Sequence, residues 1–280
     1  MGYLEVVLMA IVQGLSEFLP ISSSGHLVFT SNICKLITGT EIVYDVQEVF
    51  LDIVLHFGTL IAVLIFYRKD LARICIALYR AVKEKDYSSP DAKLGLYIIL
   101  GTFVTLIIAY PLYGIAEMLV FTPFAVGVLL TFTGFLLIFS EYVSNNILEK
   151  SDKVDLKTSI MIAISQGMAA LPGFSRSGLT IATGLILGLD RNTAARYSFL
   201  LSIPIIVAAS LLYPFIKLDI AQIAQFDFVK LAVGAIVSGI VGYFCIKYFI
   251  KFISKFSLKF FGVYCLVVGF AMTMLFYFVK

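Results

Sequence analysis

Two short clusters of polar and ionisable residues interrupt an otherwise apolar sequence. The first contains Glu17, His26 and the three consecutive serines at 22–24, and the second reads Ser-Arg-Ser at 175–177. A carboxylate, an imidazole, hydroxyl groups and a guanidinium are groups that bind phosphate and move protons. An ionisable residue at membrane depth is costly and is therefore a functional candidate. These residue types predict a phosphate-binding site.

Each cluster offers ways to bind an anion. Arg176 carries a planar fork that can grip two phosphate oxygens. Serines that follow a helix-breaking proline can cap the next helix, whose free N–H groups and positive dipole end attract an anion. Phosphate contacts are therefore predicted for Ser22, Ser24, Ser175, Ser177 and Arg176. For Ser24 and Ser177, simple helix capping is an equal alternative.

A cation site is predicted beside the first cluster. Gln13 and Glu17 lie one helical turn apart, so their oxygen atoms share a helix face and suit a hard cation such as Mg²⁺ or Ca²⁺. His26 can accept or donate a proton near neutral pH. The alternative role for Glu17 is a buried structural ion pair with Arg176.

Other polar residues are expected to be structural. Asp52 and His56, again four residues apart, are predicted mainly to form a structural hydrogen bond, with support of the site as the alternative. Glu141 falls near an expected membrane interface and needs no special role. The four cysteines have no paired spacing, so they are expected to be buried hydrophobic residues rather than disulfides or metal ligands.

The elements that position these clusters must lie in a membrane. Of the 280 residues, 60% are hydrophobic and only 14% are charged, whereas about a quarter of a soluble domain is charged. A protein core cannot absorb this much apolar sequence unless lipid surrounds it. We therefore predict an all-α, polytopic protein whose surroundings are the lipid bilayer, and we expect no nucleic-acid partner.

Six stretches are apolar and long enough to cross the hydrocarbon core as helices, which takes about 20 residues. They are Phe50–Tyr67, Leu94–Tyr113, Leu119–Ser140, Tyr197–Ile216, Phe228–Phe249 and Phe260–Val279. Two further apolar regions are broken by proline. Their halves are Leu4–Leu19 and Leu27–Ile37 in the first, and Leu156–Leu171 and Leu179–Leu189 in the second. Because such backbone at membrane depth must be buried in protein or line a cavity, each region is predicted to be a re-entrant hairpin.

The placement of Lys and Arg sets the predicted orientation. If the loop after the first span is cytoplasmic, most basic residues fall on the cytoplasmic side, as the positive-inside rule requires. Apart from Arg176 at the site, the exceptions are Lys35, Lys217, Lys230 and Lys280. This asymmetry arises only if both broken segments return to the side they came from. Both termini are then predicted to be extracytoplasmic.

The two hairpins are copies of each other. Residues 13–25 align without a gap on residues 166–178, with Gln, Gly, Ser, Ser and Gly at the same spacing. Each hairpin, at about 3–37 and 156–189, precedes three spans, so the halves are predicted at 1–142 and 155–280. An odd number of crossings per half inverts the second copy, and inverted repeats with broken helices usually place a site where the repeats meet. The two tips should therefore touch.

The same two motifs closely resemble the signatures of a known family. Gln13-Gly-Leu-Ser-Glu-Phe-Leu-Pro-Ile-Ser-Ser-Ser-Gly-His26 and Leu171-Pro-Gly-Phe-Ser-Arg-Ser-Gly178 are similar to the signature motifs of the undecaprenyl-diphosphatase family, the prokaryotic family linked with bacitracin resistance. The likeness extends over the whole chain, including Phe-Leu-Leu-Ser-Ile-Pro at 199–204.

The resemblance implies hydrolysis of undecaprenyl diphosphate to the monophosphate and inorganic phosphate in a prokaryotic cell membrane, which recycles the lipid carrier of cell-wall synthesis. The family's catalytic positions fall on Glu17, Ser23, His26 and Arg176, and its acidic motif falls on Gln13 and Glu17. Ser23 is the expected nucleophile, activated by His26 or Glu17, with direct attack by water as the alternative. Mg²⁺ or Ca²⁺ is the expected cofactor, and a homodimer is an open alternative to a monomer.

Transport is the main rival class of function. Inverted repeats with broken helices are typical of transporters, so a polyprenyl-phosphate flippase fits the same architecture. An anion channel is disfavoured because no ring of like charges is apparent. A phosphatidic-acid phosphatase is set aside because Ser-Gly-Leu-Thr-Ile-Ala, at 177–182, contains no histidine after Arg176.

Overall fold

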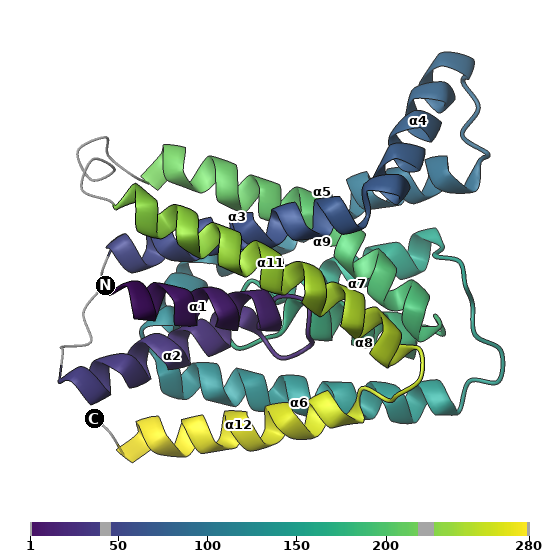
Figure 1. Ribbon diagram of the computed structural model, residues 1–280. Coiled ribbons are helices and arrows are strands. Elements are labelled where there is room, and N and C mark those ends of the chain that lie inside the picture. The colour runs from purple at the N-terminus through teal and green to yellow at the C-terminus, as the bar shows by residue number, and fades with distance from the viewer. Residues whose placement is uncertain (1, 40–45, 218–226, 279–280) are drawn as a thin grey trace.

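The computed structural model describes residues 2–39, 46–217 and 227–278. Within these ranges the chain is a bundle of helices with no β-strand (Figure 1). The helices are α1 (Tyr3–Ser16), α2 (Ser23–Thr38), α3 (Val46–Phe66), α4 (Arg68–Glu84), α5 (Pro90–Val120), α6 (Pro123–Asn145), α7 (Leu156–Met168), α8 (Arg176–Ile186), α9 (Arg191–Lys217), α11 (Phe228–Ile253) and α12 (Lys259–Phe278).

The six predicted spans are confirmed. Helices α3, α5, α6, α9, α11 and α12 are long and apolar enough to cross a membrane. Helices α3, α5 and α9 start several residues earlier than predicted, α3 at Val46. Helix α5 begins at Pro90, after the Ser89 hydroxyl accepts a hydrogen bond from Ala92 N, and continues through Pro111. Helix α9 begins at Arg191, because the Asp190 carboxylate accepts hydrogen bonds from the first N–H groups of the helix.

Each predicted broken segment is a pair of short helices, α1 with α2 and α7 with α8. The two members of each pair contact each other. In Figure 1 the α1–α2 pair occupies one end of the bundle and the α7–α8 pair the other, and each pair turns back toward the end at which it began. The first helices stop at Ser16 and Met168, ahead of the prolines. Re-entry into a bilayer stays a prediction.

Small residues let equivalent helices of the two halves approach closely. A Cβ on Gly127 would lie 2.9 Å from Gly269 O, and one on Gly134 would lie 2.7 Å from Gly262 O. Helices α6 and α12 therefore run antiparallel, with the close backbone approach that small residues permit in lipid. This pairing supports an inverted repeat, and the division of the chain at 142–155 stays a prediction.

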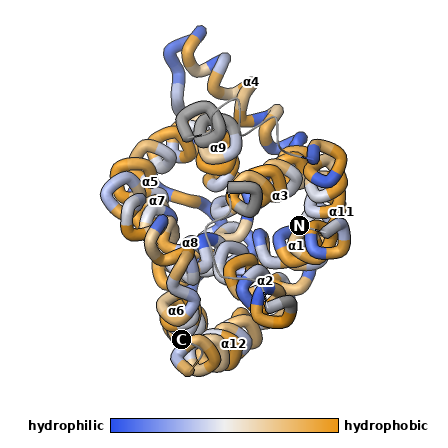
Figure 2. Tube along the Cα trace, turned by 90° about the vertical axis from the view of Figure 1, so that its left-hand side faces the viewer, coloured by the Kyte–Doolittle hydropathy of each residue, from blue (hydrophilic) through white to orange (hydrophobic). Residues whose placement is uncertain are grey.

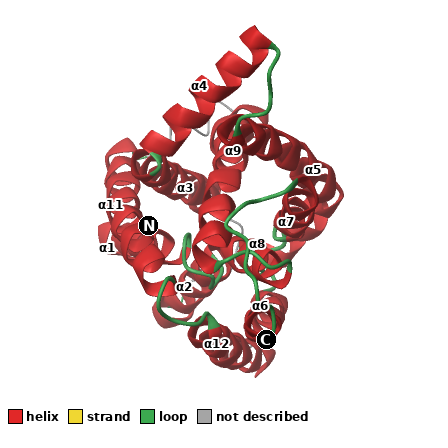
Figure 3. Ribbon diagram, turned by 90° about the vertical axis from the view of Figure 1, so that its right-hand side faces the viewer, coloured by secondary structure: helices red, strands yellow, loops and turns green. Residues whose placement is uncertain are grey.

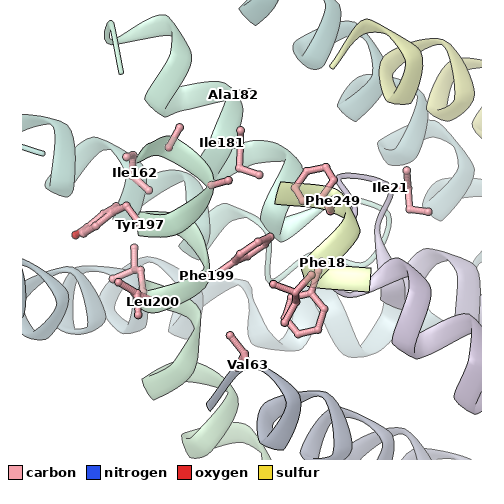
Figure 4. Close-up of a cluster of buried hydrophobic side chains, with 14 of the residues drawn as sticks. Phe18, Ile21, Val63, Ile162, Ile181, Ala182, Tyr197, Phe199, Leu200 and Phe249 are labelled. Atoms are coloured by element: carbon pink, nitrogen blue, oxygen red, sulfur yellow. The ribbon is translucent and has the colours of Figure 1, made fainter. Parts of the chain in front are cut away.

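The interior of the bundle combines an aromatic core with polar side chains. Phe18 at the first tip packs edge-on against Phe199 of α9, with ring centroids 5.4 Å apart (Figure 4). Phe199 in turn packs against Phe249 of α11. The end-on view in Figure 2 shows hydrophilic segments of α2 and α8 toward the centre and hydrophobic segments around the outside. This is the pattern of a protein solvated by lipid.

One carboxylate that sequence reasoning treated as unremarkable is a structural clamp. Glu141 of α6 is fully buried. Its two oxygens accept hydrogen bonds from Arg191 Nε at 2.9 Å and Arg191 Nη2 at 2.6 Å, and one also accepts from Leu258 N at 2.9 Å. The expectation that Glu141 needs no special role is wrong, because its side chain points into the protein and pairs there with Arg191 of α9.

Replacing Glu141 tests this clamp. Glu141→Gln removes the charge that balances Arg191, so we expect the protein to lose roughly 3 kcal/mol of stability, as when one partner leaves a buried ion pair. The measurement is the thermal midpoint of the purified protein in detergent. The control is Glu149→Gln on the exposed loop after α6. An equal midpoint for the two variants would refute the clamp.

Candidate active site

The carboxylate of Glu17 is the point at which the two tips meet. Its Oε1 atom accepts a hydrogen bond from Arg176 Nη2 at 2.5 Å, and its Oε2 atom accepts from Ser23 Oγ at 2.7 Å. Gln13 Nε2 also donates to Oε2, at 3.0 Å. The Glu17 side chain is 5% exposed and that of Arg176 is 17% exposed. The predicted convergence of Glu17, Ser23 and Arg176 is therefore present.

Serine caps set where the second helix of each pair begins. The Ser22 hydroxyl accepts a hydrogen bond from Gly25 N at 3.2 Å, and the Ser175 hydroxyl accepts from Gly178 N at 3.0 Å. These serines occupy equivalent positions of the repeat. The prediction that Ser24 and Ser177 cap these helices is therefore wrong, because Ser22 and Ser175 are the N-cap residues. Ser23 and Arg176 consequently lie in the first turns of α2 and α8.

Direct contacts hold the two tips together. Ser177 Oγ donates a hydrogen bond to Leu19 O at 2.9 Å, and a Cβ on Gly25 would lie 3.5 Å from Gly173 Cα. Gly173 has a φ of 99°, and a Cβ there would lie 2.4 Å from Val126 O of α6. Only glycine fits this left-handed, closely packed position. The N-termini of α2 and α8 thus face one region.

The remaining predicted phosphate ligands lie beside this region. Ser24 Oγ is 3.4 Å from Ser22 Oγ, and Ser175 Oγ is 3.3 Å from Ser177 Oγ. Thr133 of α6 supports the second tip, since its hydroxyl accepts from Ser175 N at 3.2 Å. No sequence pattern pointed to Thr133, which lies in the middle of an apolar span.

The two histidines occupy different places. His26 Nδ1 lies 2.8 Å from Ser22 O, and His26 Nε2 lies 2.8 Å from Tyr264 Oη. The imidazole also stacks on the Tyr264 ring. No contact joins His26 to Glu17 within the described part of the chain. His26 therefore lies on the first turn of α2 next to the cluster but outside its hydrogen-bond network.

His56 reaches Glu17 instead. Its Nδ1 atom lies 2.8 Å from Asp52 O, and its Nε2 atom lies 3.5 Å from Glu17 Oε2. The predicted hydrogen bond between Asp52 and His56 is thus made by the Asp52 backbone carbonyl, while the Asp52 Oδ1 atom lies 3.8 Å from His56 Nδ1. The less favoured alternative was that His56 supports the site, and the position of the His56 ring beside Glu17 agrees with that role. The spacing of Asp52 and His56 showed that they share a helix face, but not that this face points at the tips.

Two polar atoms of the cluster are buried without a hydrogen-bond partner. They are Arg176 Nη1 and Gln13 Oε1. A buried donor or acceptor left unpaired is costly, so each atom calls for a ligand. Nη1 is suited to an anionic oxygen and Oε1 to a cation. Binding of a cation by Gln13 and Glu17 stays a prediction.

An apolar groove of about 530 Å³ leads away from the first tip. It lies between α1, α11 and α12, and its lining includes Leu15, Leu19, Phe244 and Phe252. A second groove of about 420 Å³ between α3 and α11 shares Ile240 and Phe244 with it. Together they offer an elongated apolar surface beside a polar centre.

Comparison with known proteins reveals close relatives over nearly the whole chain. The model of the family described as bacitracin resistance protein BacA matches residues 6–271. An undecaprenyl-diphosphatase of Desulfatibacillum aliphaticivorans is 40% identical, covering 96% of this chain and 97% of its own. Proteins with the same name from Rubrobacter xylanophilus and Methanosphaera stadtmanae are 37% and 38% identical. The former covers 93% of each chain and the latter 95%.

Proposed function

As a member of the bacitracin resistance protein BacA family, this multi-pass membrane protein is an undecaprenyl-diphosphatase, and we propose that hydrolysis takes place where the two tips meet at Glu17. One observation carries the proposal. Arg176 is fixed by Glu17 through Nη2, while its buried Nη1 has no partner. The N-termini of α2 and α8 face the same region, and such helix ends attract anions.

The diphosphate binds with its terminal phosphoryl group between these helix ends. Arg176 Nη1 and first-turn N–H groups of α2 and α8 hold the phosphoryl oxygens. Phosphoryl transfer requires mainly positioning and neutralisation of charge. Because Glu17 and the tip contacts already fix Arg176, little rearrangement is needed as charge develops in the transition state.

Ser23 is the proposed nucleophile. Its hydroxyl already donates a hydrogen bond to Glu17 at 2.7 Å, so Glu17 is placed to take the proton as Ser23 Oγ attacks the terminal phosphorus. The bond from that phosphorus to the bridging oxygen breaks, and undecaprenyl phosphate leaves. Water then attacks the phosphoserine, which releases inorganic phosphate and restores the hydroxyl. Direct attack by water stays the alternative.

The two histidines have separate roles in this scheme. Ser22 O can only accept a hydrogen bond, so His26 Nδ1 carries the proton and His26 Nε2 accepts from Tyr264. A ring with an unprotonated Nε2 suits a base that activates water. His56 is a positioning residue, because at 3.5 Å it acts on the substrate only through Glu17.

A divalent cation, Mg²⁺ or Ca²⁺, is the proposed cofactor, and Gln13 and Glu17 would hold it. Gln13 Oε1 is buried without a partner and is the type of ligand that such ions prefer. Within the described residues, no three His, Cys, Asp or Glu side chains gather as a metal site. Oxygen atoms of the diphosphate would therefore serve as further ligands of the cation, and the cation would neutralise part of the negative charge of the diphosphate.

The prenyl tail lies in the apolar groove that starts at Leu15 and Leu19. This groove is lined by apolar side chains of α1, α11 and α12, and Leu15 and Leu19 place one part of it next to Glu17 in the chain. We further propose the prokaryotic cell membrane as the location, with both termini extracytoplasmic. The ends of the described chain lie at the same end of the bundle (Figure 1), which supports a shared side. A homodimer stays a prediction, and the comparisons give the flippase alternative no support.

Arg176 variants test the phosphate contact. Arg176→Ala removes the fork, so we expect the rate of phosphate release from undecaprenyl diphosphate to fall about 10³-fold, and Arg176→Lys, which keeps only the charge, to lower it about 10²-fold. The matched control is Arg196→Ala, whose guanidinium pairs with Asp70 away from the tips. Near-normal turnover by Arg176→Ala would show that hydrolysis does not take place at this site.

Histidine variants test the division of roles. Because a base must be unprotonated, the rate falls at low pH, and His26→Gln should abolish that acidic limb together with most of kcat. His56→Gln should keep the limb and lower kcat about tenfold through the misplaced Glu17 carboxylate. Full pH–rate profiles of both variants provide the measurement. Loss of the acidic limb in His56→Gln alone would exchange the two assignments.

Gln13 variants test the cation. A chelator should reduce phosphate release, and a titration of Mg²⁺ or Ca²⁺ should restore it. Gln13→Glu adds a negative ligand, so the cation concentration for half-maximal rate should fall about tenfold, while Gln13→Leu should raise it. Identical cation dependence in all three proteins would show that Gln13 holds no cation.

A further inference from the structure

Helix α4 lies where the sequence predicted the loop after the first span, and it exposes more apolar surface than a solvated helix needs. Ile74 and Ala81 are buried, and Leu78 packs so closely on α5 that a Cβ on Gly95 would lie 2.7 Å from it. This face attaches α4 to the bundle. On a different side of α4 lies a second apolar stripe, formed by Cys75, Ile76, Tyr79 and Val82.

The second stripe is uncovered within the described structure. Ile76 is 52% exposed, Tyr79 is 69% exposed and Val82 is 66% exposed. At about 3.6 residues per turn, Cys75, Tyr79 and Val82 fall in one row along the helix. An apolar row of this kind on a short helix needs an apolar environment on that side.

A basic face adjoins the stripe. It consists of Lys69, Arg73, Arg80 and Lys83, all of which are exposed. Arg73 pairs with Asp70 at 2.7 Å, and Lys69, Arg80 and Lys83 add further positive charge to this exposed face. An apolar stripe bordered by Lys and Arg is the pattern of a helix that lies in the plane of a membrane interface.

The position of α4 agrees with that pattern. Helix α3 ends at Phe66 and α4 begins at Arg68, so α4 starts where a span leaves the hydrocarbon core. Figure 1 shows α4 running across the direction of the spans at one end of the bundle, and Figure 3 shows it reaching past the outline of the other helices. It therefore overhangs the area that lipid occupies.

We propose that α4 is a membrane-surface helix that binds anionic lipid headgroups. The stripe of Cys75, Ile76, Tyr79 and Val82 enters the acyl boundary, and the basic face binds lipid phosphates. Each cation near an anionic surface strengthens such association by roughly fivefold. A second copy of the chain is a poorer occupant, since a symmetric contact through the stripe would bring two basic faces together.

Cys75 provides a native position for a probe, because it is exposed on the stripe while Cys245 and Cys265 are buried. The experiment labels Cys75 of the full-length Cys34→Ser protein with a fluorophore in nanodiscs. The discs contain phosphatidylcholine alone or with phosphatidylglycerol. Quenching by lipids brominated on the acyl chain should exceed quenching by aqueous iodide, and phosphatidylglycerol should increase it severalfold. A label on Glu84→Cys, on the other side of α4, in a protein that also carries Cys34→Ser and Cys75→Ser, should show the reverse preference.

Replacing the basic residues of α4 by uncharged ones tests whether their charge causes the response to phosphatidylglycerol. Lys69, Arg73, Arg80 and Lys83 changed together to Gln should abolish the effect of phosphatidylglycerol. The same number of changes at Lys93, Lys150, Lys153 and Lys157, outside α4, should leave it intact. Iodide quenching of Cys75 that no lipid alters would overturn the proposal. So would cross-linking of Cys75 to Cys75 between two copies, which would make the stripe a protein interface. The labelled Cys34→Ser protein decides the matter even if a multiple variant fails to fold.

Discussion

A buried carboxylate must be paired, and the pairing of Glu17 is the constraint from which the centre of this protein is built. Its hydrogen-bond partners come from three helices: Gln13 on α1, Ser23 on α2 and Arg176 on α8. Removing any one of them would leave charge or hydrogen-bonding capacity unpaired in a low-dielectric interior. The two tips are therefore held together by electrostatics in addition to packing.

The shape of each tip follows from this requirement. The helices stop before proline, serines cap the helices that follow, and Gly173 lies against α6 where no side chain fits. The result is two helix N-termini that face one region, with a guanidinium between them. The same contacts that satisfy Glu17 leave Arg176 Nη1 without a partner. Stability and phosphate binding thus depend on one set of residues.

The sequence predicted the spans and the meeting of the tips because both follow from long-range patterns. Apolar length identifies spans, and the repeated motif together with the asymmetry of Lys and Arg brings the tips together. Side-chain direction was not predictable in the same way. His56 turned out to face Glu17 and His26 to face Tyr264, and no spacing within α3 or α2 decides this. The role of Glu141 was missed because a sequence does not show which way a side chain near the end of a span points. Helix α4 was missed because the apolar residues of α4 are divided between two sides of the helix.

The most direct test of the account is a double-mutant cycle on the rate of phosphate release from undecaprenyl diphosphate. The cycle compares Glu17→Ala, Arg176→Ala and the double variant with the unchanged protein. If the two side chains act as one unit, the double variant should be no more than about tenfold slower than the worse single variant. Losses that multiply would show that Glu17 and Arg176 act independently, and would contradict a site built on their contact.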